Sequence, residues 1–215
     1  MSAQKDNEAP RRPGRPRGQK SGSANREQLM DIALALFARH GIARISLNAI
    51  AKEAGVTPAM LHYYFSSREA LVEKLVEERF MPLRSEIGQI FVAHGDDPVT
   101  AFTLLIKTLA TMAEKNAWFA PLWMQEIIGE MPVLRQHMHA RFGDEKYHKM
   151  LETVRRWQRE GKLNPALSPE LLFTTLISLV LVPFSRMRND ERLSALSPEI
   201  VVRHVLAVIG TGIGG

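Results

Sequence analysis

The sequence lacks several features that would place it in common functional classes. None of its 215 residues is a cysteine, which excludes disulfide bonds, thiolate metal sites and a cysteine nucleophile. The N-terminus has no apolar stretch of the kind that directs secretion. The longest apolar run, residues 176–184, is interrupted by Ser178 and Pro183 and is too short to span a bilayer. These absences predict a soluble protein of a reducing, cytoplasmic compartment.

Signatures of catalysis and of cofactor binding are also missing. There is no phosphate-cradling glycine loop and no nucleophile elbow, and the glycines of residues 210–215 follow a predicted helix. His137 and His139 point to nearly opposite sides of a helix, which disfavours a shared metal ion. Glu126 and Glu130 could pair as carboxylates, but we interpret them as surface charge. No enzyme, metal site or cofactor is therefore predicted.

Positive charge is in excess, and it lies at one end of the chain. The formal net charge is +5, and residues 1–26 hold seven basic side chains against two acidic ones. The rest of the chain is therefore neutral overall. A short basic block on a polar N-terminus is typical of an arm that contacts a polyanion. We assign residues 1–25 to a basic, disordered arm; a solubilising leader is the alternative.

Residues 11–18 of this arm read Arg-Arg-Pro-Gly-Arg-Pro-Arg-Gly. Proline holds the backbone extended, and glycine removes bulk. The strip resembles an AT-hook, in which Arg15 and Arg17 would point into a narrow A·T-rich minor groove. Loose contact with phosphates is the alternative.

Apolar residues recur at helical spacing after the arm. The first stripe comprises Leu29, Ile32, Ala33, Leu36 and Phe37. Gly41 is expected to end this helix, because glycine readily adopts the backbone conformation of a helix C-terminus. Ser46 is expected to cap a second helix, whose inner face begins at Leu47.

A turn and a short third helix follow. Gly55 is free to adopt a positive φ at the turn, and the small side chain of Ala51 lets two helices cross closely. Thr57 begins the third helix, with Pro58 at its first position. This order is typical of a helix-turn-helix, whose last helix lies in the major groove of DNA. A small three-helix bundle of another function is the alternative.

Residues 46–71, SLNAIAKEAGVTPAMLHYYFSSREAL, resemble the DNA-binding domain of the TetR-like (tetracycline repressor-like) regulators. The preceding helix, with Ala33, Phe37 and Gly41, is also similar. The resemblance covers about residues 26–75, which we assign as the helix-turn-helix domain. It implies a homodimer whose all-helical C-terminal domain binds a small-molecule inducer.

Side-chain chemistry and this resemblance together predict the DNA contacts. Phosphate contacts are predicted for Ser46, Thr57, Tyr64 and Arg68. Contacts with base edges and thymine methyls are predicted for Pro58, Ala59, His62 and Tyr63. The family commonly has tyrosine where this chain has His62 and lysine where it has Arg68. The arginine keeps a phosphate-binding charge, whereas the histidine has a different reach. Tyr64 could instead belong to the core, because it lies on the inner stripe.

Residues 76–210 form the predicted regulatory and dimerisation domain. Aromatic and methionine side chains gather there at helical spacing, and ordinary core packing is expected for most of them. We expect an apolar ligand cavity near Met112, Trp118 and Trp123, which would accept a hydrophobic or aromatic effector.

Two late segments predict an oligomer interface. Residues 169–184 are apolar nearly all round, and a final helix is expected to begin at Pro198; such helices must be covered on every side. Pairing both with their symmetry mates would form an isologous four-helix interface. Its predicted members are Leu172, Leu176, Leu179, Val202 and Val205. A monomer whose own helices cover both segments is the alternative. Residues 210–215 are expected to fray.

The sequence thus predicts an all-α protein, with an N-terminal three-helix helix-turn-helix domain and a C-terminal helical ligand-binding and dimerisation domain. The favoured function is a dimeric, sequence-specific regulator, a repressor released from a palindromic double-stranded DNA operator by a small molecule. An architectural protein that binds A·T-rich DNA is the alternative. A helical enzyme with a buried pocket is a third possibility.

Overall fold

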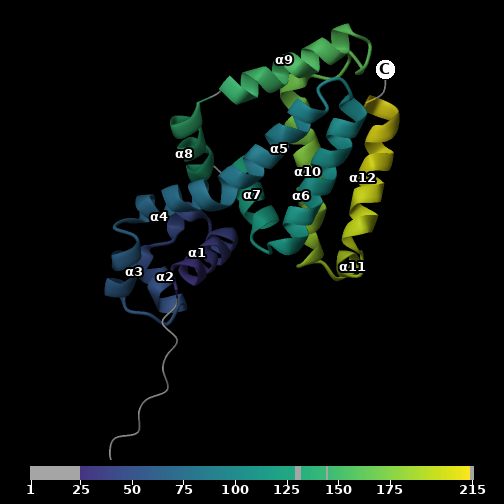
Figure 1. Cartoon of the computed structure of the whole chain (residues 1–215). Coiled ribbons are helices and arrows are strands. Elements are labelled where there is room, and N and C mark those ends of the chain that lie inside the picture. Colours follow the sequence, from purple (N-terminus) through teal and green to yellow (C-terminus); the bar gives the residue numbers. More distant parts are fainter. Residues whose placement is uncertain (1–24, 129–131, 144, 214–215) are drawn as a thin grey trace, which may run out of the picture.

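The computed structural model describes residues 25–128, 132–143 and 145–213. The basic arm, with Arg15 and Arg17, lies outside the described residues except for Asn25. The described part contains helices and no strand, which confirms the predicted all-α class (Figure 1). Its elements are α1 (Arg26–His40), η1 (Ile42–Arg44), α2 (Leu47–Glu53), α3 (Pro58–Tyr64), α4 (Arg68–Leu75), η2 (Val76–Phe80), α5 (Met81–Ala93), α6 (Pro98–Lys115), α7 (Phe119–Ile128), α8 (Val133–Phe142), α9 (Glu145–Arg159), α10 (Pro169–Met187), α11 (Glu191–Ser194) and α12 (Pro198–Ile213).

Local hydrogen bonds set both ends of α1. The Asn25 side chain accepts a hydrogen bond from the Gln28 backbone N–H at 2.9 Å, and the Gln28 side chain accepts one from the Asn25 backbone N–H at 3.0 Å. This reciprocal capping box satisfies two N–H groups that have no partner within the helix. At the other end Gly41 has a φ of +82°, and its N–H donates to the Phe37 carbonyl at 2.8 Å. The predicted end of this helix is therefore confirmed.

One helical path joins the two halves of the chain. α4, η2 and α5 follow one another without a loop, so one helical path continues past Phe80. η2 is a π-helical turn and stands directly before Pro82, which has no N–H to donate. The expected domain boundary between residues 75 and 76 consequently lies inside a continuous helical segment, and any tilt of α5 is carried directly to α4.

α10 is the central helix of the C-terminal half. It packs against α6, α7, α9, α11 and α12. By length and composition it is the one helix of the described part that could cross a membrane. Here six of its apolar side chains, Phe173 and Leu176 among them, are buried against neighbouring helices. The aromatic rings of Phe173, Phe91 and Phe102 pack together with centroids 5.5–6.0 Å apart.

Two side chains of α9 donate hydrogen bonds to one backbone carbonyl group, in the loop between α5 and α6. The Trp157 indole N–H donates to the Gly95 carbonyl at 2.6 Å, and Arg156 donates to the same oxygen. The Trp157 ring is fully buried against Phe102, with centroids 5.7 Å apart. These contacts hold the loop between α5 and α6 against α9.

The residues predicted for the dimer interface lie largely inside the single chain. Leu172, Leu176 and Val205 are buried by helices of the same chain, because α10 and α12 pack against α6 and against each other. Leu179 and Val202 are half-buried against the same core. The helical periodicity of apolar residues identified the two helices, but it did not indicate which side of each helix is exposed to solvent. The exposed apolar side chains are Leu171 and Val182 on α10, and Ile200 and Val208 on α12.

The C-terminal end of the chain also differs from the expectation. α12 continues to Ile213, so the prediction that residues 210–215 fray is wrong for residues 210–213. Glycine costs about 1 kcal/mol in a helix interior, and that cost is offset here because α12 packs along α6. The short helix α11 was not predicted.

Glu126 on α7 is a buried acid rather than a surface charge, which corrects its interpretation. It is only 6% exposed, and its carboxylate accepts a hydrogen bond from the Arg135 backbone N–H at 3.1 Å. Burial raises the pKa of Glu126, and the backbone N–H groups of Arg135 and Leu134 oppose that shift. Glu130, its expected partner, lies outside the described residues.

The buried carboxyl group of Glu126 makes stability depend on pH. Since its pKa is raised on folding, the native state binds the proton more tightly than the unfolded chain. The free energy of unfolding should therefore fall as pH rises from the ordinary carboxyl pKa through the raised one. Glu126→Gln keeps an oxygen acceptor without a charge. It should abolish this fall and raise stability at neutral pH by on the order of 1 kcal/mol.

Urea unfolding between pH 4 and pH 8 measures the effect of Glu126→Gln. Glu114→Gln, on the exposed side of α6, is the matched control and should leave the pH profile unchanged. An identical profile for wild type and Glu126→Gln would contradict the role assigned to the buried carboxyl group.

Candidate nucleic-acid interface

The turn between α2 and α3 is built around Gly55. Its φ is +65°, a conformation that residues with a side chain rarely adopt. The Gly55 N–H donates to the Lys52 carbonyl at 3.2 Å, and the Val56 N–H donates to the Ala51 carbonyl at 3.0 Å. This pair of bonds is a Schellman motif, which ends α2 and redirects the chain into α3. Ala51 is buried where the two helices pack, as its small size predicts.

Hydroxyl groups cap the starts of α2, α3 and α4. The Ser46 Oγ accepts from the Ala49 N–H at 3.2 Å, and the Thr57 Oγ1 accepts from the Met60 N–H at 3.2 Å. At the start of α4 the Ser67 Oγ accepts from the Ala70 N–H at 3.1 Å. Ser67 was not among the predicted DNA contacts. The hydroxyl hydrogens of Ser46 and Thr57 are still free to donate, since the cap uses only an oxygen lone pair. A phosphate beside α2 or α3 would also meet the positive end of the helix dipole.

α3 exposes one face and buries the other. Leu61 of α3 and Phe65, just beyond its end, are buried. They belong to the same hydrophobic core as residues of α1 and α2. The predicted base-contact residues all lie exposed on the opposite side: Pro58, Ala59, His62 and Tyr63. Tyr63 is 84% exposed, although an apolar ring of that size usually finds cover. Its edge meets the ring of Tyr64, with centroids 5.3 Å apart.

Tyr64 and Arg68 lie at the border between this face and the core. Tyr64 is half-buried against the core, so both its predicted phosphate role and the core alternative agree with its position. Arg68 is the first residue of α4 and is partly exposed. Its nearest carboxylate oxygen, on Glu69, is 3.8 Å away, and its buried Nε has no hydrogen-bond partner among the described residues. The guanidinium group is therefore available to an outside acceptor.

Further basic residues flank this face without having been predicted. Arg44 precedes α2 and Lys52 lies in its last turn, and both side chains are exposed. Neither forms an ion pair with any residue that the structure describes. Residue spacing did not identify Arg44 and Lys52 as possible DNA contacts, because isolated surface lysines and arginines are common in any soluble protein.

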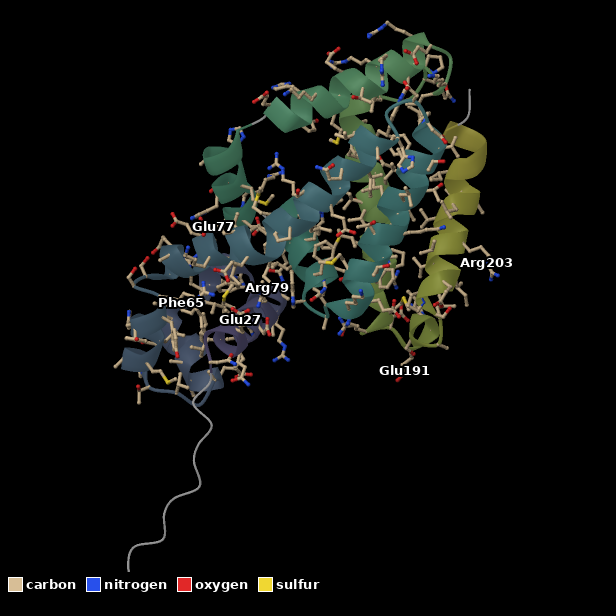
Figure 2. The ribbon with its side chains drawn as sticks, in the orientation of Figure 1. Glu27, Phe65, Glu77, Arg79, Glu191 and Arg203 are labelled. Carbon is tan, nitrogen blue, oxygen red and sulfur yellow. The ribbon has the colours of Figure 1, made fainter. Side chains whose placement is uncertain are left out.

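Ion pairs hold α1 to the helical segment that leads into the C-terminal half. Arg26 forms a two-pronged contact with Glu78, at 2.7 and 2.5 Å, and its guanidinium lies 5.7 Å from the Phe65 ring centroid. Arg79 donates to Glu27 at 2.6 Å, as the labelled side chains in Figure 2 show. The Arg26 side chain lowers the pKa of Glu78, so this contact is retained in the ionised form at neutral pH. The start of α1, from which the arm extends, is thereby fixed to η2.

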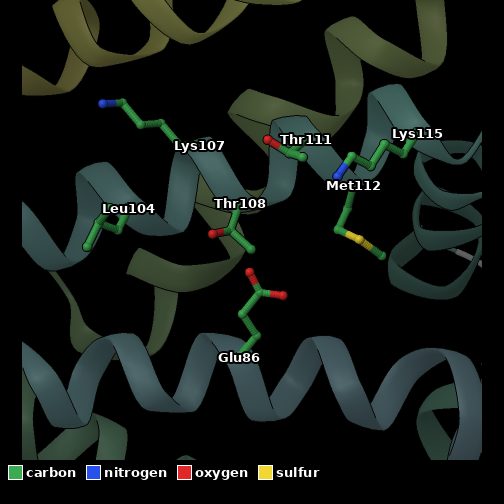
Figure 3. Close-up of a pocket in the computed structure, with 7 residues that line it drawn as sticks. All are labelled: Glu86, Leu104, Lys107, Thr108, Thr111, Met112 and Lys115. Carbon is green, nitrogen blue, oxygen red and sulfur yellow. The ribbon is translucent and has the colours of Figure 1, made fainter.

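A cleft of about 200 Å³ lies between α5 and α6 (Figure 3). Glu86 reaches from α5 towards Thr108 on α6. The remaining lining residues all belong to α6: Leu104, Lys107, Thr111, Met112 and Lys115. The cleft is therefore more polar than the apolar cavity that was expected.

The expected pocket residues do not line one cavity together. Met112 lines the cleft, whereas Trp118 packs edge-on against Phe80 with ring centroids 5.4 Å apart. Trp123 lies tilted against Phe119 at 6.2 Å. The indole N–H of Trp123 is buried and has no hydrogen-bond partner among the described residues. Aromatic spacing alone could not separate core packing from a cavity wall, because both need the same apolar side chains.

Comparison with known proteins agrees with this geometry. Residues 29–75 match the bacterial regulatory proteins of the tetR family. An uncharacterized HTH-type transcriptional regulator of Mycobacterium tuberculosis is 35% identical over 97 residues, which cover 43% of this chain and 48% of that protein. The chain thus spans about half the length of this relative. The HTH-type transcriptional regulator AcrR of Shigella flexneri is 29% identical over 153 residues, 66% of this chain and 67% of that protein.

Solved structures share the fold over most of the chain. The ketosteroid transcriptional regulator KstR2 of Mycobacterium tuberculosis superimposes with a TM-score of 0.67 and 19% identity, covering 88% of this chain and 94% of that one. The complex of SmeT with triclosan has a TM-score of 0.55 and 22% identity, covering 85% and 90%. The match of residues 29–75 makes the helix-turn-helix segment similar to that of the bacterial regulatory proteins of the tetR family, and the solved structures share the two-part helical fold, so the chain resembles a TetR-like regulator.

Proposed function

We propose that the protein is a cytoplasmic, dimeric, sequence-specific DNA-binding regulator of transcription, a repressor that a small molecule releases from its operator. The observation that carries this proposal is the exposed face of α3, with uncovered side chains beside the hydroxyl caps of α2 and α3. Relatives named as transcriptional regulators and a transcriptional repressor support it. The proposal involves no catalysis.

In this proposal α3 enters the major groove. Ala59 and the Tyr63 ring are placed to meet thymine methyl groups, and His62 can donate to or accept from a base edge. Pro58 stands at the N-terminal end of the helix, which is the end that approaches bases in helix-turn-helix proteins. The large exposed ring of Tyr63 gains cover only when a partner is bound.

Phosphates would flank the groove at Ser46, Thr57, Tyr64 and Arg68. The first two offer hydroxyl and backbone N–H donors at helix starts, and Arg68 offers a partly exposed guanidinium group whose one ion pair, with Glu69, is long at 3.8 Å. Arg15 and Arg17 of the arm would add contacts in the minor groove next to the site.

A two-fold dimer would present two such faces to a palindrome. The surface proposed for pairing consists of Leu171, Val182, Ile200 and Val208, the exposed apolar residues of α10 and α12. Exposed side chains of this kind on two packed helices fit an isologous contact between copies. The half-sites would then lie about 34–36 Å apart.

The effector is proposed to be a small hydrophobic or aromatic molecule with one hydrogen-bond acceptor. The Trp123 N–H is a buried donor without an acceptor among the described residues, and the Phe119 ring lies beside the Trp123 ring with centroids 6.2 Å apart. Met112 lies on the neighbouring helix α6. Neighbouring structures described as a ketosteroid regulator and a triclosan complex are consistent with this ligand class.

An architectural role on A·T-rich DNA remains the second candidate. It rests on the composition of the arm, in which prolines and glycines separate several arginines. In that case α3 would support binding without choosing the sequence.

Selection of genomic DNA fragments by the purified full chain, at a stated near-physiological salt concentration, separates the two candidates. We expect one palindromic motif, bound by wild type and lost or altered with Tyr63→Ala. Recovery of A·T-rich fragments without symmetry would replace the repressor by the architectural role. Failure to recover any DNA would contradict both.

Arg68→Ala tests the phosphate contacts separately from base reading. The variant should bind all fragments about tenfold more weakly, because one charge-assisted contact per half-site is lost. The slope of log affinity against log salt should become shallower by about 1 per half-site. Arg159→Ala, on the exposed last turn of α9, is the control and should keep both values. An unchanged slope with Arg68→Ala would remove this residue from the interface.

Val208→Asp tests the proposed dimer surface. Val208 is 51% exposed in the single chain, so the substitution should not disturb folding, but it would place a charge inside an apolar contact. We expect the dimer dissociation constant to rise at least about tenfold, measured by analytical ultracentrifugation. Val92→Asp, at a position on α5 that is 77% exposed, should remain dimeric. A Val208→Asp protein that pairs as wild type does would place the interface elsewhere.

A further inference from the structure

α3 presents a single histidine on its exposed face. His62 is the one histidine of residues 46–71, and its side chain is exposed. It lies three positions after Ala59 and four after Pro58, so the three side chains share one side of the helix. α3 lies at the outer edge of the N-terminal half, away from the C-terminal bundle (Figure 1). His62 therefore stands among the proposed base-contact residues on a surface that its own chain leaves open.

The imidazole ring of His62 has no partner within the part of the chain that the structure describes. It forms neither an ion pair nor a side-chain hydrogen bond there. α2, which packs against α3, brings Lys52 and Glu53, and the start of α4 brings Arg68 and Glu69. The charges of these two cations and two carboxylates cancel one another. The charge that α3 itself presents to a partner therefore depends on His62.

Protonation changes what an imidazole ring can bind. Histidine is the side chain that ordinarily gains or loses a proton between about pH 5 and pH 8. The neutral ring has one N–H donor and one acceptor nitrogen, whereas the charged ring has two donors and no acceptor. Tyrosine side chains stay neutral in this range, and the other titratable groups of α3 are Tyr63 and Tyr64. His62 is therefore the one group of this helix whose hydrogen-bonding character changes there.

The base edges of the major groove distinguish between the two forms of the ring. Guanine presents two acceptors, N7 and O6, whereas adenine presents one acceptor and one amino group, and cytosine presents an amino group. A charged imidazole matches guanine, since it has donors only. The neutral ring can also accept a hydrogen bond from the amino group of adenine or cytosine.

We infer that His62 makes base selection by α3 depend on pH: its charged form selects guanine, and its neutral form also accepts adenine or cytosine. This inference rests on the proposed function and adds to it a regulation of the same site. The phosphates of the duplex favour the charged ring, so binding takes up a proton at each half-site. The affinity for DNA should consequently rise as the pH falls through the histidine range.

The fragment selection, repeated with the full chain at pH 6 and pH 8 and at one fixed ionic strength, tests the base choice. At pH 6 we expect guanine at one symmetry-related pair of motif positions, and at pH 8 a mixture of bases at the same pair. A duplex with guanine at this pair should bind about fivefold more tightly per half-site at the lower pH. This is the value for a histidine whose charged form binds about tenfold more tightly than its neutral form.

His62→Gln removes the titrating ring and keeps a donor and an acceptor. Because glutamine pairs with the N6 and N7 atoms of adenine, this variant should select adenine at the same pair of positions at both pH values. The dependence of its affinity on pH should disappear. The side chain of His62 is exposed, so the substitution should not disturb folding.

His148→Gln is the matched control. His148 is also exposed, but it belongs to α9, which Figure 1 shows well separated from α3. This variant should keep both the base choice and the pH dependence of wild type.

The remaining outcomes separate the inference from the proposed function. One palindromic motif with the same bases at both pH values would overturn the role of His62 and leave the proposed function standing. An equal rise in affinity at pH 6 for wild type and His62→Gln would assign the proton to another group, and would also overturn that role. No palindromic motif at either pH would overturn the proposed function, and the inference with it.

Discussion

The ends of helices impose the constraint on which the rest of this structure depends. Every helix leaves N–H groups at its start and carbonyl groups at its end without partners, and a buried end must find them elsewhere. In the N-terminal half these partners are close in sequence. Ser46 and Thr57 cap the helices that follow them, and the turn at Gly55 lets backbone N–H and carbonyl groups bind each other. Between the N-terminal helices and the C-terminal bundle the partners come from α7, because its Gln125 caps α1 and its Glu126 caps α8.

These two solutions have different mechanical consequences. Local caps make the helix-turn-helix a rigid unit, because each helix start is held by a residue that immediately precedes it. Caps supplied by a distant helix tie that unit to another body and let the two influence each other. The ion pairs of Arg26 and Arg79 hold the start of α1 to η2, and the Gln125 amide holds the C-terminal end of α1 to α7.

The C-terminal half is packed around α10, and this packing decides which surfaces remain for partners. Because α6, α7 and α12 cover most of α10, only one side of α10 and α12 keeps exposed apolar residues. A face of this kind fits pairing with a second copy, and the same packing leaves the Trp123 N–H buried without an acceptor. Dimer contact and effector contact are therefore proposed for two different sides of the same bundle.

Local patterns in the sequence predict the starts of α2 and α3, the turn at Gly55 and the exposed face of α3, with Pro58, Ala59, His62 and Tyr63. Caps, turn glycines and helical stripes act over a few residues, so they can be read from local spacing. Only the tertiary structure decided the burial of Glu126, the contact of Gln125 with Ala38 and the outward side of α10. Leu172, Leu176 and Val205 are buried by helices of their own chain for the same reason, which their apolar spacing did not indicate. Burial depends on which distant segments pack together, and a periodic apolar pattern does not say which of several neighbours will cover it.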